Sequence, residues 1–293
     1  MKKKIIILIL GLFTLTGCKF NLNNDNMKDI NIYTTIYPIR YLISSLYGDY
    51  STIKSIYPSG VDPKDFELSD KKLTEYSKTD LFVFNSLDRD RDFAVDMINK
   101  NKKLKVIDVS MGMNYDYDIS ELWLNPYNYL MMAQNTKDGL LEYVSNPYLI
   151  SNTDKTGIED KYEELKYNLS RLDADIKEDI SLAAYKTIVV DNNVFKFLEK
   201  YNLNVISLEE TDELSDNTIN EVKKLINNGS IKYIYSSSEE TNSTCQNLIN
   251  NYNVELVTLN TMKTIDGGIT NSNENYITVM NNNIDLLNKE LYK

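Results

Sequence analysis

Apolar residues recur along this chain with two spacings that alternate from segment to segment. Short, largely apolar runs are typical of buried strands, and they lie at residues 30–35, 51–57, 81–85, 104–109, 187–190, 204–208, 231–235 and 254–259. Segments with an apolar residue every three or four positions are typical of helices that face a core, and they lie at residues 39–47, 69–76, 93–99, 194–201, 218–227, 244–252 and 275–291. This alternation predicts parallel sheets with helices on both faces.

One helical segment is much longer than the others. Residues 158–180 contain no Gly or Pro, and Leu165, Leu169, Leu172 and Ile176 recur at spacings of three and four. The pattern predicts one amphipathic helix of about 35 Å, at ~1.5 Å per residue. Since strands and helices alternate both before and after it, we expect an α/β protein with two lobes joined by one long rigid helix.

The first residues have the pattern of a secretory signal. Three lysines at residues 2–4 precede an apolar run at residues 5–15, which is shorter than the roughly 20 residues that a spanning helix needs. Residues 15–18, Leu-Thr-Gly-Cys, resemble a bacterial lipobox, in which Cys18 is lipid-modified and becomes the new N-terminus. A plain signal peptide with an incidental cysteine is the alternative. With the anchor, we expect the protein on the outer face of the cytoplasmic membrane.

These features divide the chain into parts. The residues after Cys18 are rich in Asn and Asp and have little to bury, which is typical of a flexible tether. We expect a lipoprotein signal peptide at residues 1–17, a lipid-anchored tether at 18–28, an N-terminal α/β lobe at 29–150, the linking helix at 151–182 and a C-terminal α/β lobe at 183–293.

Composition excludes several classes of protein. The net charge of −11 argues against nucleic acid as a partner. The chain has two cysteines, so an acylated Cys18 leaves Cys245 without a disulfide partner, and we expect Cys245 to be a buried structural thiol. The sequence contains no His, no Gly-rich phosphate loop and no recognisable nucleophile motif. We therefore expect no enzymatic activity.

Several short motifs appear in a fixed order around the long helix. They are Thr-Thr-Ile-Tyr-Pro at 34–38, Tyr-Pro-Ser-Gly-Val-Asp-Pro-Lys-Asp-Phe-Glu at 57–67, Leu-Trp-Leu-Asn-Pro at 122–126, Asp-Asn-Asn-Val-Phe at 191–195, Glu-Leu-Ser at 213–215 and Leu-Asn-Thr-Met at 259–262. Together they resemble the metal-binding solute-binding lipoproteins of zinc and manganese ABC importers. The resemblance implies a monomer that binds its ligand in the cleft between the lobes and delivers it to an ABC permease and its ATPase.

The resemblance also implies a binding site at Lys64, Glu121, Asn192 and Asn260, where the family usually places the ligands of Zn²⁺ or Mn²⁺. The family usually has His at the first two positions, His or Glu at the third and Asp at the fourth. Glu121, Asn192 and Asn260 retain oxygen atoms, which compete poorly for zinc and are too few for Ca²⁺. Lys64 would have to lose a proton to act as a ligand, at a cost of roughly 4.6 kcal/mol at pH 7.

Our hypothesis for this degenerate site is an ion pair between Lys64 and Glu121 in place of the metal, with Asn192 and Asn260 completing the hydrogen bonds. Two alternatives remain open. The four positions are not neighbours, or nearby carboxylates rebuild a metal site, for which the candidates are Asp65, Asp191 and Asp266.

Two classes of function remain after these arguments. The first is a receptor for a metal or for another small solute, whose carboxylate Lys64 could bind in a pocket lined by Tyr37, Tyr127 and Tyr129. The second is a cell-surface interaction protein, similar to an adhesin, that keeps the scaffold without transport.

Overall fold

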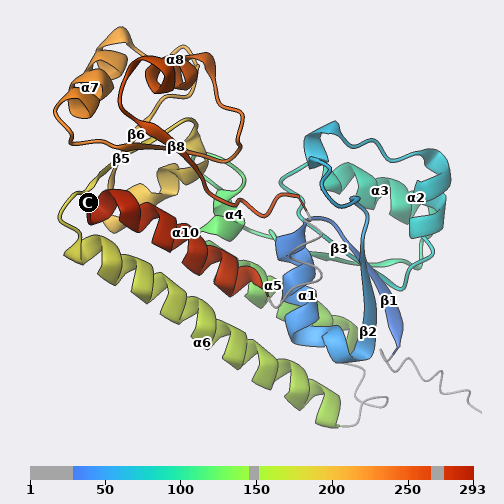
Figure 1. The fold of residues 1–293 in the computed structure, drawn as a ribbon. Helices are drawn as coiled ribbons and strands as arrows, with labels where there is room; N and C mark the ends of the chain where they lie inside the picture. The colour runs from blue at the N-terminus through green and yellow to red at the C-terminus, as the bar shows by residue number, and fades with distance from the viewer. Residues whose placement is uncertain (1–28, 145–151, 265–273) are drawn as a thin grey trace, which may run out of the picture.

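The computed structural model describes residues 29–144, 152–264 and 274–293 of the chain (Figure 1). The expected signal peptide, Cys18, the tether and Asp266 lie outside the described residues. Among the residues that are described, no helix combines the length and the apolar character needed to cross a membrane.

The N-terminal lobe contains a four-stranded parallel sheet with strand order β2-β1-β3-β4. Its strands are β1 (Ile30–Thr34), β2 (Ser51–Ser55), β3 (Leu81–Phe84) and β4 (Lys105–Asp108). They alternate with the helices α1 (Tyr37–Tyr47), α2 (Asp70–Tyr76) and α3 (Asp90–Lys100) and with the short 3-10 turns η1 (Gly48–Tyr50) and η2 (Pro63–Asp65). Every residue of β3 is buried, as expected for an inner strand of a parallel sheet.

The C-terminal lobe repeats this topology, with a second parallel sheet in the order β6-β5-β7-β8. Its strands are β5 (Thr187–Val190), β6 (Asn204–Ser207), β7 (Tyr233–Ser236) and β8 (Glu255–Thr258). The connections are η3 (Asn193–Tyr201), α7 (Asp216–Asn227) and α8 (Ser243–Asn251). The predicted two-lobed α/β architecture is therefore confirmed, although η3 is a 3-10 helix rather than the expected α-helix.

The helix α6 (Asn152–Leu182) extends along both lobes (Figure 1). Leu165, Leu169, Leu172 and Ile176 are all buried, which confirms the predicted apolar face of the long helix. A second helix, α10 (Tyr276–Leu291), packs against α6.

The helix α10 also contacts both lobes. At its first residue, the Tyr276 ring stacks on Tyr129 with a centroid distance of 4.1 Å, and its hydroxyl donates to the Trp123 carbonyl at 2.6 Å. Near its end, the buried Glu290 carboxylate accepts the backbone N–H groups of Lys232 and Tyr233, both at 2.9 Å. The lobes are thus connected by α10 as well as by the long helix.

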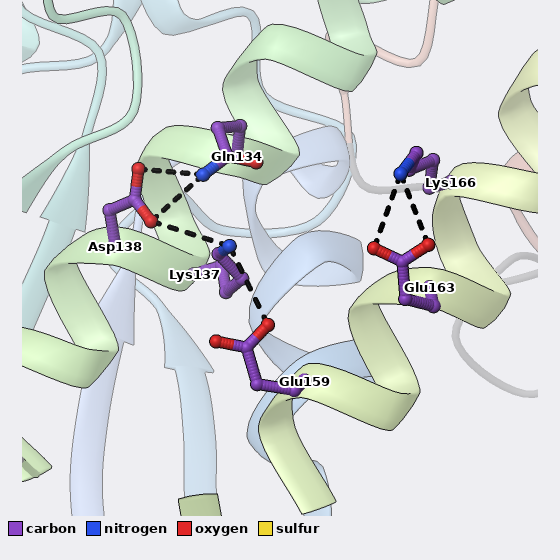
Figure 2. A network of polar contacts seen from close by, with 6 residues as sticks. All are labelled: Gln134, Lys137, Asp138, Glu159, Glu163 and Lys166. Carbon is purple, nitrogen blue, oxygen red and sulfur yellow. Dashed lines mark hydrogen bonds and ion pairs between the residues drawn. The ribbon is translucent and has the colours of Figure 1, made fainter. Parts of the chain in front are cut away.

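Two helices that the sequence did not predict precede α6. They are the single turn α4 (Glu121–Leu124) and the long helix α5 (Pro126–Val144). Polar contacts line the place where α5 meets α6 (Figure 2). Lys137 of α5 lies 3.6 Å from the carboxylate of Glu159 in α6 and 3.5 Å from that of Asp138, which also accepts hydrogen bonds from Gln134.

The buried apolar residues form two clusters. The larger one includes side chains of both sheets together with α1, α5, α6 and α10, so apolar packing continues from lobe to lobe. The smaller one lies within the C-terminal lobe and contains Cys245, which is fully buried. The complete burial of Cys245 agrees with the predicted buried thiol, and burial raises the pKa of the thiol to about 12.

Candidate functional site

A polar pocket of about 410 Å³ is lined by side chains from both lobes. On the C-terminal side, its walls come from the segments that follow the four strands: Asn192 and Asn193 after β5, Glu209 after β6, Ser237 and Ser238 after β7, and Thr261 and Lys263 after β8. Ligands of open parallel sheets bind in this position, outside the carboxyl ends of the strands.

The N-terminal lobe contributes Lys64 to the pocket. Lys64 lies in η2, where the side chain of Asp62 accepts its backbone N–H at 2.8 Å. The guanidinium of Arg89 donates to the carbonyl oxygens of Pro63 and Lys64, both at 3.0 Å. These contacts hold the backbone of the loop, while the Lys64 side chain is exposed and forms no hydrogen bond or ion pair with any described residue.

Asn192 also lines the pocket. Its side-chain oxygen accepts the backbone N–H of Val194 at 3.0 Å and so caps η3. Its amide nitrogen donates to the hydroxyl of Ser237 at 3.1 Å. The structure therefore brings Lys64 and Asn192 to one pocket, as the resemblance implied. The side-chain oxygen of Asn192, however, already accepts the hydrogen bond that caps η3.

Glu121 does not line this pocket. It is 8% exposed, and its carboxylate accepts the backbone N–H of Asp116 at 3.1 Å. The proposed ion pair between Lys64 and Glu121 is wrong. Asp118 does line the pocket, and its carboxylate lies 3.6 Å from the ammonium of Lys263.

The charges around Asp118 favour its ionised form. Burial opposes ionisation, but the ammonium of Lys263, hydrogen bonds from Ser120 and the nearby Lys64 together hold the pKa of Asp118 below its ordinary value. The ionised carboxylate of Asp118 is therefore favoured in the pocket, chiefly by its ion pair with Lys263.

Asn260 was placed at the fourth ligand position, but its exposed side chain accepts the backbone N–H of Met262 at 2.8 Å and does not line the pocket. Lys263, three residues further on, does. The sequence reasoning missed Lys263, Asp118 and Glu209. The positions of Lys263 and Glu209 just after predicted strands were the available signal, since such positions meet at one edge of a parallel sheet.

The other candidate residues have structural surroundings. Asp65 is exposed in η2, and the buried Asp191 accepts the hydroxyls of Ser236 at 2.6 Å and Thr241 at 3.2 Å. Burial raises the pKa of Asp191.

None of the three tyrosines proposed for the pocket lines it. Tyr37 and Tyr129 are buried in the core, while Tyr127 is 62% exposed. The tyrosine of the pocket is Tyr117, whose hydroxyl donates to the Glu199 carboxylate at 2.9 Å.

The donor set does not fit zinc or manganese. Within residues 29–144, 152–264 and 274–293, no three Cys, Asp or Glu side chains gather in a group that could hold a metal ion, and the chain has no His. Two ammonium groups, those of Lys64 and Lys263, line the pocket where the resemblance implied metal ligands. A divalent cation would be repelled by both groups.

The fold and the pocket together define a two-lobed α/β protein, with one parallel sheet in each lobe and a polar pocket lined by residues of both. Residues 32–290 match the family model described as ZnuA, zinc-uptake complex component A, periplasmic. The chain belongs to this family.

Relatives extend the comparison. The chain is 24% identical over 315 residues to the zinc-binding lipoprotein AdcA of Streptococcus pneumoniae, and the match covers 97% of this chain but only 60% of AdcA. It is 26% identical over 249 residues to a metal ABC transporter substrate-binding lipoprotein of Lactococcus lactis, covering 76% of each. The Zn(II)-bound ZnuA-like domain of AdcA superposes with a TM-score of 0.71 at 22% identity, covering 90% of this chain and 100% of that domain.

Proposed function

We propose that this chain is the extracytoplasmic solute-binding component of an ABC importer and that it holds its solute in the pocket between the lobes. The pocket of about 410 Å³, with polar walls from both lobes, carries this proposal. Its volume lies in the range of small-molecule sites, roughly 300–1,000 Å³. The relative in Lactococcus lactis is named as a substrate-binding lipoprotein of such a transporter. The proposed partners are a permease and its ATPase, to which the protein, as a monomer, would deliver its solute.

The proposal includes a lipid anchor on Cys18 at the outer face of the cytoplasmic membrane. The support is the sequence, in which a short apolar run ends at Leu-Thr-Gly-Cys.

We further propose that the cleft has lost the metal specificity that the name of AdcA states for that relative. The argument is electrostatic, because the pocket contains the ammonium groups of Lys64 and Lys263 and the whole chain lacks imidazole. Calorimetric titration of the chelator-treated full chain with Zn²⁺ and Mn²⁺ tests this. We expect no stoichiometric binding with a Kd below about 1 μM, which corresponds to roughly −8.2 kcal/mol; binding tighter than this would contradict the loss.

A variant designed to restore zinc binding provides a second test of the lost metal specificity. Lys64→His, Asn192→His and Lys263→Glu together replace two ammonium groups by ligands and supply three donors at one pocket, the number found in open zinc sites. We expect this triple variant to bind Zn²⁺ more tightly than the parent. The matched control is the double variant without Asn192→His, which should bind less tightly than the triple.

The chain has a built-in reporter for solute binding. Trp123 is its one tryptophan, and the indole N–H donates to the carbonyl of Thr261, a pocket residue, at 2.7 Å. A solute that enters the pocket should therefore change the emission of Trp123. A protein whose emission and thermal stability respond to no solute would count against the receptor proposal and favour the cell-surface interaction protein.

A further inference from the structure

Two opposite charges in the inter-lobe pocket form no ion pair with a described residue, although Lys64 also interacts electrostatically with Asp118 beyond ion-pair distance. The ammonium of Lys64 comes from the N-terminal lobe, and the carboxylate of Glu209 comes from the C-terminal lobe. Neither forms a hydrogen bond or ion pair with any residue that the structure describes. The remaining charges are engaged, since Asp118 pairs with Lys263 and Asp62 accepts the backbone N–H of Lys64. The free cation and the free anion are therefore available to a solute.

The two free charges narrow the class of solute. An inorganic anion would gain from Lys64 but would meet the carboxylates of Glu209, Asp62 and Asp118. A metal cation would meet two ammonium groups, Lys64 and Lys263. A neutral solute such as a sugar would offer hydroxyl groups to both side chains but no opposite charge, so its hydrogen bonds would be weaker than those between charged groups. A solute with one carboxylate and one ammonium group satisfies both charges.

We propose that the pocket binds a small zwitterion with the chemistry of an amino acid, its carboxylate on Lys64 and its ammonium on Glu209. This inference rests on the proposed receptor function and specifies its solute class. Hydroxyl groups of the pocket supply further hydrogen bonds. The Ser237 hydroxyl accepts a hydrogen bond from the side-chain amide of Asn192. Its own O–H can therefore donate a hydrogen bond to the carboxylate of the solute. Charge-assisted hydrogen bonds of both kinds are the strong ones in binding sites.

The test titrates the full chain, purified in mild detergent, with each of the common L-amino acids while Trp123 emission and heat are recorded. Sodium phosphate, zinc chloride, manganese chloride and glucose complete the panel as non-zwitterionic probes. We expect at least one amino acid to bind, and Lys64→Met and Glu209→Gln each to raise its Kd at least tenfold. The matched controls are Lys72→Met and Glu221→Gln, which replace exposed residues outside the pocket and should change the Kd less than twofold.

Blocked solutes assign each end of the zwitterion. The amide of the bound amino acid lacks the carboxylate, so Lys64→Met should have no further effect on its binding. The N-acetyl derivative lacks the ammonium group, so Glu209→Gln should have no further effect on that compound. Circular dichroism of each variant verifies that the fold is retained.

The outcomes separate this inference from the receptor function. An amino acid that binds both pocket variants as tightly as the parent overturns the zwitterion site. Binding of phosphate, a metal or glucose alone, with a change in Trp123 emission, also overturns it but leaves the receptor function standing. A full panel without any binding overturns the zwitterion inference and counts against the receptor as well.

Discussion

At the scale of single residues, the carboxyl group of Asp90 lies buried at the start of α3. Asp90 is 3% exposed and accepts a hydrogen bond from the hydroxyl of Tyr57. Burial raises the pKa of Asp90 from its ordinary value of 3.8 to about 6, against the opposing effect of the hydrogen bond from Tyr57. Because the native pKa is raised, the neutral carboxyl stabilises the fold below pH 4, and this contribution disappears as the pH rises through 6.

Asp90→Asn should remove this dependence on pH. Each tenfold change in proton affinity is worth 1.36 kcal/mol, and the unfolded-state carboxyl is already partly ionised at pH 4, so the ionisable side chain should cost about 2 kcal/mol more at pH 7 than at pH 4. The amide oxygen of Asn can still accept the Tyr57 hydroxyl. Urea denaturation of both proteins at the two pH values measures the difference. The exposed Asp96→Asn is the control, and an equal pH response in Asp90→Asn and the parent would refute the argument.

At the scale of secondary-structure elements, α5 approaches β4 closely at Gly139. A Cβ atom on Gly139 would lie 2.8 Å from Cγ1 and 2.9 Å from Cγ2 of Ile107, which is 3% exposed. A helical glycine costs about 1 kcal/mol relative to alanine. Gly139 thus permits the close contact between the helix and the sheet.

Gly139→Ala should therefore destabilise the protein by about 1 kcal/mol, because overpacking costs ~1–3 kcal/mol and the gain in helix propensity offsets part of it. Chemical denaturation measures this change. Ile107→Ala should cost less in the Gly139→Ala background than in the parent, which a double-mutant cycle detects. Gly48→Ala is the matched control, since its Cβ would meet no atom within 4 Å and its φ is −57°; a similar loss there would contradict the contact argument.

At the scale of the whole molecule, Tyr276 connects the lobes through α10. Its ring stacks on Tyr129 and on Tyr41, with centroid distances of 4.1 and 5.8 Å. Its hydroxyl donates to the carbonyl of Trp123 at 2.6 Å. Because the larger core cluster also includes side chains from both lobes, we expect the lobes to unfold together.

Tyr276→Ala should destabilise the protein by about 3–5 kcal/mol, the range of large aromatic truncations in cores. Tyr276→Phe keeps the ring and should cost about 1–3 kcal/mol for the unpaired carbonyl. Calorimetry of the parent should show one transition with equal calorimetric and van't Hoff enthalpies. Two separate transitions in the parent would contradict the shared core.

Much of this fold follows from local patterns in the chain. Short runs with apolar residues identified the eight strands that the structure describes. The clearest is β3, which is buried at every residue, because a strand buried on both faces needs a continuous apolar segment. The spacing of Leu165, Leu169 and Leu172 identified α6, whose apolar face is buried. The helix α5 was missed, since its polar residues and Gly139 obscure the helical period and its stability comes from packing on α6 and β4.

Which residues line the pocket could be learned only from the tertiary structure. Motif order led to Lys64 and Asn192, but Asn260 was selected where Lys263 lines the pocket, because motifs align chain positions and not the directions of side chains. Glu209 and Lys64 come from different lobes and line one pocket only because the tertiary structure brings the two lobes together there. Local sequence therefore specifies the elements, while packing of the two lobes across α6 and α10 determines which charges share the cleft.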